Sequence, residues 1–197
     1  MLNTPDSYYL IMIPVNIMVG RFQPLTDGHM KCVEAAYKEL GVDTILCLID
    51  TPDNKVDARH PFATSVLLPI YKDLMKTYKH IKDIVVVKNA DIVKIGEMLY
   101  GEYEIVSWTC GTDRIDSYRS MSDKYKEQAH LADNFKMIEV KRGDEDISAT
   151  KVRKALLDND VRTFNALTPY NTLKSHLSND NNVFEILRQK MLDVTAK

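Results

Sequence analysis

The chain has the size and composition of a folded globular domain. Of its 197 residues, 45% are apolar and 27% charged, which argues against a disordered, collagen-like or membrane class. The 26 Lys and Arg residues nearly balance 28 Asp and Glu, for a net charge of −2. No global positive field is therefore expected to attract a nucleic acid, and an anionic ligand must be held locally.

The cysteines and the N-terminal residues suggest a cytoplasmic protein. Cys32, Cys47 and Cys110 are odd in number and widely spaced, which fits neither a disulfide framework nor a metal site and favours a reducing cytoplasm. The apolar run 8–19 contains proline and asparagine and is shorter than the roughly 18 residues that span a bilayer. We expect no membrane contact, no secretory signal, and an N-terminal extension over residues 1–14.

Apolar periodicity predicts alternating strands and helices along the chain. Residues 15–20 form a β-branched apolar run that ends at a glycine, and residues 28–40 repeat apolar positions at helical spacing before Gly41. The pattern continues with strands predicted at 44–49, 83–87, 103–108 and 135–140 and helices at 61–78, 91–100, 148–157 and 161–167.

This alternation predicts a Rossmann-like, doubly wound α/β fold. We expect a mostly parallel sheet of five or six strands with helices on both faces, and a ligand site at the carboxyl ends of the strands. The fold should occupy residues 15–168. A polar linker and a C-terminal helical extension, with a helix from 183 to about 194, should follow over residues 169–197. That helix could contact a second copy of the chain, although packing on its own sheet is the simpler expectation.

The loop after the first predicted strand is the first candidate site. It runs Gly20-Arg21-Phe22-Gln23-Pro24-Leu25-Thr26-Asp27-Gly28-His29. Glycines permit close backbone approach, and a helix N-terminus with a histidine attracts an anion, to which Arg21 could add a permanent charge. A Gly-His pair alone, however, is compatible with an ordinary strand-to-helix turn.

Two further segments carry similar residue types at the starts of helices or the ends of strands. In Ile147-Ser148-Ala149-Thr150-Lys151-Val152-Arg153, the serine is a favoured N-cap and the arginine offers a forked donor. In Trp108-Thr109-Cys110-Gly111-Thr112-Asp113-Arg114, the glycine permits backbone approach, the aspartate can accept from a ribose or a base, and the arginine can meet phosphate. Each also has a plain interpretation, as a capped surface helix and as a common turn.

Together these segments resemble the nucleotidylyltransferase superfamily. The first is similar to its Gly-Arg-Phe-Gln-Pro-x-His-x-Gly-His signature and the second to its Ile-Ser-x-Thr-x-x-Arg element, about 120 residues apart as in that superfamily. The third looks like the Cys-Gly-x-Asp loop of nicotinamide mononucleotide (NMN) adenylyltransferases, and the archaeal type of these enzymes is the most similar. The resemblance covers residues 15 to about 157.

The resemblance implies transfer of a nucleotidyl group from ATP or CTP to a phosphorylated small molecule, with NMN favoured, and release of pyrophosphate. It assigns catalysis to His29, Arg153 and Thr26, with Mg²⁺ held mainly by the substrate phosphates. The nucleotide-binding residues it implies are Gly20, Arg21, Phe22, Gln23, Gly28, Gly111, Asp113, Arg114, Ser148 and Thr150. Enzymes of this resemblance are frequently homo-oligomers.

Thr26 departs from the signature, because it stands where the Arg-Phe-Gln-Pro form has its first histidine. Phosphopantetheine adenylyltransferases are similar in having Thr-x-Gly-His, and a hydroxyl can hydrogen-bond a phosphate oxygen without carrying charge. Three alternatives therefore stay open: a cytidylyltransferase, a phosphopantetheine adenylyltransferase, and a nucleotide-binding or regulatory module without turnover.

Two weaker features have plain explanations as well. The sequences Asn54-Lys55 and His60-Pro61-Phe62 echo the Asn-Pro-Phe-Thr segment of the same enzymes, but proline at a helix start needs no function. Trp108 could stack on a base, although a lone tryptophan at the end of a buried strand is more often core.

Overall fold

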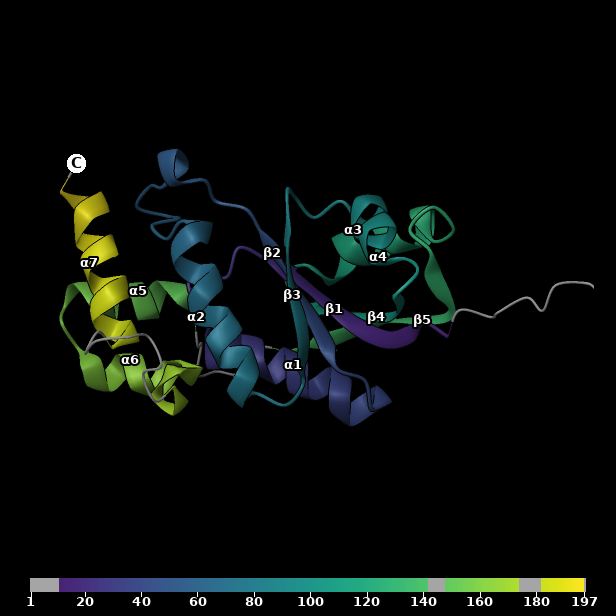
Figure 1. Cartoon of the computed structure of the whole chain (residues 1–197), viewed down its shortest axis with the longest axis horizontal. Coiled ribbons are helices and arrows are strands. Elements are labelled where there is room, and N and C mark those ends of the chain that lie inside the picture. Colours follow the sequence, from purple (N-terminus) through teal and green to yellow (C-terminus); the bar gives the residue numbers. More distant parts are fainter. Residues whose placement is uncertain (1–10, 142–147, 174–181, 197) are drawn as a thin grey trace, which may run out of the picture.

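The computed structural model describes residues 11–141, 148–173 and 182–196, and its centre is a parallel sheet of five strands in the order β3-β2-β1-β4-β5 (Figure 1). The strands are β1 (Ile13–Gly20), β2 (Thr44–Ile49), β3 (Ile81–Val87), β4 (Tyr103–Gly111) and β5 (Leu131–Val140). Chain order reverses between β1 and β4, so the loops after these two strands open the crevice where such sheets bind ligands.

Helices cover both faces of the sheet, as the alternating pattern predicts. On one face lie α1 (Asp27–Leu40) and α2 (Thr64–Thr77), and on the other α3 (Ile92–Leu99) and α4 (Ile115–Tyr125). Each face has its own apolar core, because strand side chains alternate between the two sides. The Rossmann-like fold is therefore confirmed.

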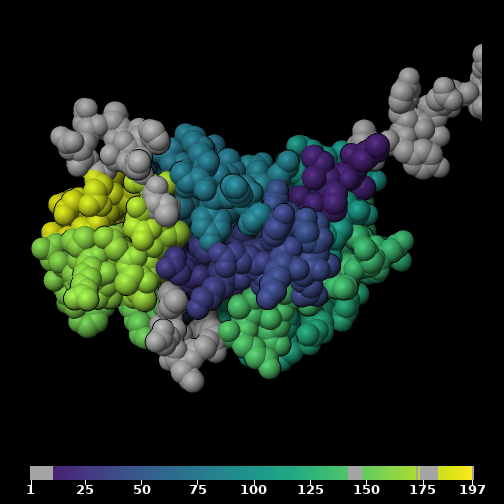
Figure 2. Space-filling view, turned by 90° about the horizontal axis from the view of Figure 1, so that it is seen from below, coloured from purple at the N-terminus to yellow at the C-terminus, as the bar shows by residue number. Residues whose placement is uncertain are grey.

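The C-terminal helices extend the core on the α1 and α2 face. These are α5 (Ala149–Leu157), α6 (Val161–Leu167) and α7 (Val183–Thr195), with short 3₁₀ turns at Asp53–Lys55 and Pro169–Thr172 elsewhere in the chain. Figure 2 shows them, green to yellow, as one flank of the molecule beside the segments of α1 and α2. The apolar side of α7 is buried in the core that contains α2 and α5, so this helix packs on its own chain.

Local chemistry explains where several elements begin and end. Gly41 closes α1 with φ of 69°. Asp91, Ser148 and Asn182 cap α3, α5 and α7, respectively, with side-chain oxygens that accept backbone N–H groups. Gly96 permits α3 to lie against the chain beyond α4, since a Cβ there would lie 2.0 Å from the Ala129 carbonyl oxygen.

The predicted strands and helices are present, with three informative differences. Helix α2 begins at Thr64 rather than at Pro61, because the backbone groups of Phe62 bind a glutamine side chain instead of continuing a helix. The strands β1, β3, β4 and β5 extend two to four residues beyond their predicted ranges. Helix α4 is absent from the prediction, because only Ile115, Tyr118 and Ser122 of this polar segment are buried and the apolar stripe is too narrow to stand out.

No helix in the described part of the chain is long and apolar enough to cross a membrane.

Candidate active site

The loop after β1 has an unusual backbone conformation that a buried tyrosine stabilises. Phe22 has φ of 45°, a left-handed value that residues with a side chain rarely adopt without support. The Tyr71 hydroxyl of α2 gives this support, donating to the Phe22 carbonyl at 2.6 Å and accepting from the Leu25 N–H at 3.0 Å. A Cβ at Gly20 would lie 2.8 Å from the Phe22 ring. The fold thus holds the loop in one shape before any ligand arrives.

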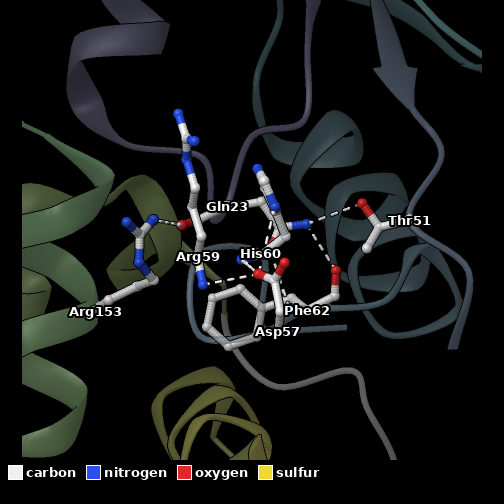
Figure 3. Close-up of polar contacts among 7 residues, drawn as sticks. All are labelled: Gln23, Thr51, Asp57, Arg59, His60, Phe62 and Arg153. Atoms are coloured by element: carbon white, nitrogen blue, oxygen red, sulfur yellow. Dashed lines mark hydrogen bonds and ion pairs between the residues drawn. The ribbon is translucent and has the colours of Figure 1, made fainter. Parts of the chain in front are cut away.

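Gln23 fastens the same loop to the segment that precedes α2. Its side-chain amide donates to the Phe62 carbonyl at 2.7 Å, and its side-chain oxygen accepts from the Phe62 N–H at 3.0 Å. Only 5% of Gln23 is exposed, so these bonds satisfy groups that would be costly to leave unpaired. Figure 3 shows Gln23 at the centre of this network, with Thr51 on one side.

His29 is oriented by the first turn of its own helix. Its Nδ1 accepts from the Thr26 N–H at 3.0 Å and lies 3.0 Å from the Thr26 hydroxyl. In the neutral ring the proton therefore lies on Nε2, the nitrogen that can donate to an anion. The Phe22 ring meets His29 edge to face, with centroids 5.2 Å apart. Thr26 itself is only 1% exposed, so in this structure it positions His29.

The second motif contacts the first directly. The Arg153 guanidinium donates from one terminal nitrogen to the Gln23 carbonyl at 2.8 Å and from the other to the Thr150 hydroxyl at 3.1 Å. Ser148 caps α5 by accepting from the Lys151 N–H at 3.3 Å. The prediction that the two elements meet at one edge of the sheet is confirmed. Ile147, which opens the motif, lies outside the described residues.

Positive charge is concentrated where the two motifs meet. Partial burial, and then the positive charge of Arg59, lower the pKa of Arg153. None of the ion pairs between described residues includes either arginine. Arg59 is exposed and comes from the segment before α2, and Figure 3 shows it at the carbonyl end of Gln23, where Arg153 from α5 also lies. An anion between them would meet two guanidinium groups.

Comparison of the sequence with family models decides which family has this arrangement. Residues 17–155, which run from the second half of β1 through most of α5, match the model described as cytidylyltransferase-like. The chain belongs to the cytidylyltransferase-like family. A comparison with curated protein sequences finds no match.

Solved structures with a similar fold include several nucleotide-binding proteins. A Plasmodium falciparum nicotinic acid mononucleotide adenylyltransferase complexed with NaAD has a TM-score of 0.59 at 14% identity, over 94% of this chain and all of that one. A Vibrio parahaemolyticus protein assigned as a nicotinate-nucleotide adenylyltransferase scores 0.54 at 18% identity, over 93% and 96%. Thermotoga maritima TmcAL bound with alpha-thio ATP scores 0.53 at 12% identity, over 92% and 56%. At these identities the likeness establishes the fold alone.

The third predicted segment of this cytidylyltransferase-like chain, residues 108–114, differs from the loop after β1 in how it is supported. Gly111 ends β4, and its carbonyl accepts from the Arg114 N–H at 3.0 Å. The Asp113 carboxylate and the Arg114 guanidinium lie 3.6 Å apart, with both side chains at least half exposed. Trp108, by contrast, is fully buried and stacks on Tyr118 with ring centroids 4.1 Å apart. The interpretation of this tryptophan as core is confirmed.

The structure therefore divides the predicted site residues into groups. The first two motifs meet where the Arg153 guanidinium of α5 contacts the Gln23 carbonyl of the loop before α1, whereas Arg21 is exposed on the first loop and the Gly111–Arg114 loop follows β4. Phe22, Gln23 and Thr26 are buried and support the others. Sequence reasoning missed Tyr71, the Phe62 backbone and Arg59. The echo of a family segment at His60-Pro61-Phe62 was the one available signal, because these residues sit beside Arg59.

Proposed function

We propose that the protein is a nicotinamide-nucleotide adenylyltransferase, which makes NAD and pyrophosphate from ATP and NMN. The contact between the Arg153 guanidinium and the Gln23 carbonyl carries this proposal, because it brings the two phosphate-binding motifs of the family together at two helix N-termini. Similarity of fold to nicotinic acid mononucleotide adenylyltransferases supports the choice of acceptor class.

In the proposed reaction, a phosphate oxygen of NMN attacks the α-phosphorus of ATP in line. The bond between that phosphorus and the oxygen bridging to the β-phosphate breaks, and pyrophosphate leaves with the electron pair. No enzyme nucleophile is required. His29 and Arg153 would neutralise charge that builds on the transferring and leaving phosphates, and the rigid loop after β1 would align the two anionic substrates.

Magnesium enters this proposal as part of the nucleotide substrate. Among the described residues, no group of three or more His, Cys, Asp or Glu side chains is placed to hold a metal ion. The guanidinium groups of Arg59 and Arg153, at the carbonyl end of Gln23, suit phosphate rather than metal. We therefore assign the ion to the triphosphate oxygens, where it offsets phosphate charge.

His29→Ala tests the mechanism most directly. We expect turnover to fall by about 10²- to 10³-fold, as loss of one transition-state donor typically causes. His80→Ala is the matched control, because His80 is a partly buried histidine stacked on Tyr37, just before β3 begins. A wild-type rate in His29→Ala would show that this residue is not catalytic.

A panel of substrates tests the acceptor and the nucleotide. ATP and CTP are each offered with NMN, nicotinic acid mononucleotide, phosphopantetheine and a polyol phosphate, and pyrophosphate release is measured. ATP with NMN should give the highest rate. The best rate with CTP would favour a cytidylyltransferase, which the family match supports as the second candidate. Nucleotide binding without pyrophosphate in any combination would show a binding module.

A further inference from the structure

We propose that Arg59 binds the two terminal phosphates of the nucleoside triphosphate and, with Arg153, makes the protein select triphosphates over monophosphates. This inference rests on the proposed function, because it assigns one end of the same substrate. Arg59 belongs to neither signature motif.

The turn that carries Arg59 is fixed although its side chain is exposed. The Asp57 carboxylate accepts from the Arg59 N–H at 2.8 Å and from the His60 N–H at 2.6 Å. The backbones of Asp57 and His60 also bind each other in both directions, at 3.2 and 3.1 Å. Donation by the His60 N–H, above all, lowers the pKa of Asp57, so the carboxylate remains an acceptor at neutral pH. The base of the Arg59 side chain is thus held in place.

This turn is tied to the site through Gln23. Phe62, three residues after Arg59, exchanges two hydrogen bonds with the Gln23 side chain, and the Gln23 carbonyl accepts from Arg153. Gln23 therefore contacts both the segment that carries Arg59 and the Arg153 side chain, and Figure 3 shows the two arginines at the carbonyl end of Gln23.

The electrostatics of this arrangement favour an anion. Arg114 and Arg119, on the other side of the sheet, each lie within 4 Å of a neighbouring aspartate. Arg59 and Arg153 instead lie close enough for one to disfavour the charged form of the other, with no carboxylate paired to either in the described chain. A polyphosphate would relieve this repulsion and accept charge-assisted hydrogen bonds from both guanidinium groups.

The position of Arg59 decides which phosphates it meets. Arg153 also contacts Thr150 and is partly buried, whereas Arg59 is exposed at the outer side of the pair. The phosphate that is transferred should lie near His29, at the start of α1. We therefore assign Arg59 to the phosphates that leave as pyrophosphate, which a monophosphate lacks.

Binding measurements on the full chain test the assignment without needing turnover. Calorimetric titrations with ATP, AMP and inorganic tripolyphosphate compare the wild type with Arg59→Ala, Arg59→Lys and Lys76→Ala. We expect Arg59→Ala to lower the affinities for ATP and tripolyphosphate by about 10- to 100-fold, as loss of a charged hydrogen-bond donor does, and the affinity for AMP by about 3-fold or less. The affinities of Arg59→Lys should lie between those of the wild type and Arg59→Ala, because lysine keeps the positive charge and loses the forked pair of guanidinium donors.

Lys76→Ala is the control for charge alone. Lys76 is exposed, pairs with Asp73 at 2.7 Å and lies at the far end of α2, so its loss should leave all three affinities unchanged. Thermal unfolding should show that Arg59→Ala is folded, since this exposed side chain supports no core contact.

Equal affinity of Arg59→Ala and the wild type for tripolyphosphate, or an equal loss for ATP and AMP, would overturn the assignment. So would a wild type that binds neither triphosphate nor tripolyphosphate. Pyrophosphate release by the wild type tests the proposed function separately. Turnover by the wild type together with triphosphate affinity that does not depend on Arg59 would contradict only the assignment of Arg59. Binding that depends on Arg59, without turnover, defeats only the transfer reaction.

Discussion

Two loops at the carboxyl edge of the sheet, one after β1 and one after β4, are supported in opposite ways. The first is buried and bonded to residues 39 to 130 positions away in the sequence, through Phe62, Tyr71 and Arg153. In the second, the Arg114 N–H bonds the Gly111 carbonyl three residues before it, and the exposed charges of Asp113 and Arg114 face each other.

This difference follows from what each loop is proposed to bind. Charge on a transferring phosphate must be met by donors already in place, because reorganising them during the reaction would raise the barrier. A loop that contacts the ribose or base of a nucleotide affects binding more than the chemical step and can adapt. Substitutions in the first loop should therefore lower both stability and turnover, whereas those in the second should change binding alone.

Gln23→Leu should have the largest effect on the first loop. It leaves the N–H and the carbonyl of Phe62 buried without partners, which costs about 1–3 kcal/mol for each group. We expect the free energy of unfolding to fall by about 2–6 kcal/mol. Turnover should fall by about 10- to 100-fold in the folded fraction, because the loop shifts relative to its substrates. Chemical denaturation and pyrophosphate release measure the two effects, and wild-type values for both would contradict the proposed rigidity.

Tyr71→Phe should have the next largest effect, because it removes only the hydroxyl that bonds Phe22 and Leu25. We expect a loss of about 1–3 kcal/mol in unfolding free energy and a roughly 10-fold lower kcat. Tyr118→Phe is the matched control, since the buried Tyr118 ring stacks on Trp108 on the opposite face of the sheet. This substitution should lower the free energy of unfolding by about 0.5 kcal/mol or less.

A purely structural role of Tyr71 would give a different result. The lower kcat should persist well below the melting temperature, where all molecules are folded. A kcat that recovers fully on cooling would show that the hydroxyl stabilises the fold without positioning the loop.

Sequence patterns predicted most of this architecture, because the information was local. Residues 44–49 form a short apolar run, which predicts a buried strand, and residues 161–167 form a short predicted helix that Pro169 closes; both ranges agree with the structure. The meeting of Arg153 with the first loop was also predictable, since parallel strands place their following loops at one edge. The resemblance of the motifs to the nucleotidylyltransferase superfamily supplied the candidate site residues.

The supports of the site could not be predicted from local patterns. The Tyr71 hydroxyl bonds residues 46 and 49 positions away, and nothing in its apolar helix distinguishes it from any core tyrosine. Arg59 stands in a polar segment whose fold depends on Gln23, so its approach to Arg153 follows only from long-range packing. Helix α4 was missed for a related reason, because its three buried residues become a helical face only once β4 is in place.

Arg114→Ala should have the smallest effect on stability and is the best test of the second loop. Its ion pair with Asp113 is exposed, and such pairs contribute about 1 kcal/mol or less. We expect an unchanged unfolding midpoint, an unchanged kcat and a KM for nucleotide or acceptor that rises by about 3- to 10-fold, because a group that binds ground and transition states equally affects KM alone. Steady-state kinetics with each substrate varied in turn will identify which one the loop contacts. A fall in kcat comparable to that of Tyr71→Phe would mean that this loop, too, aligns the reacting phosphates, and the contrast between the two loops would then reflect only how they are supported.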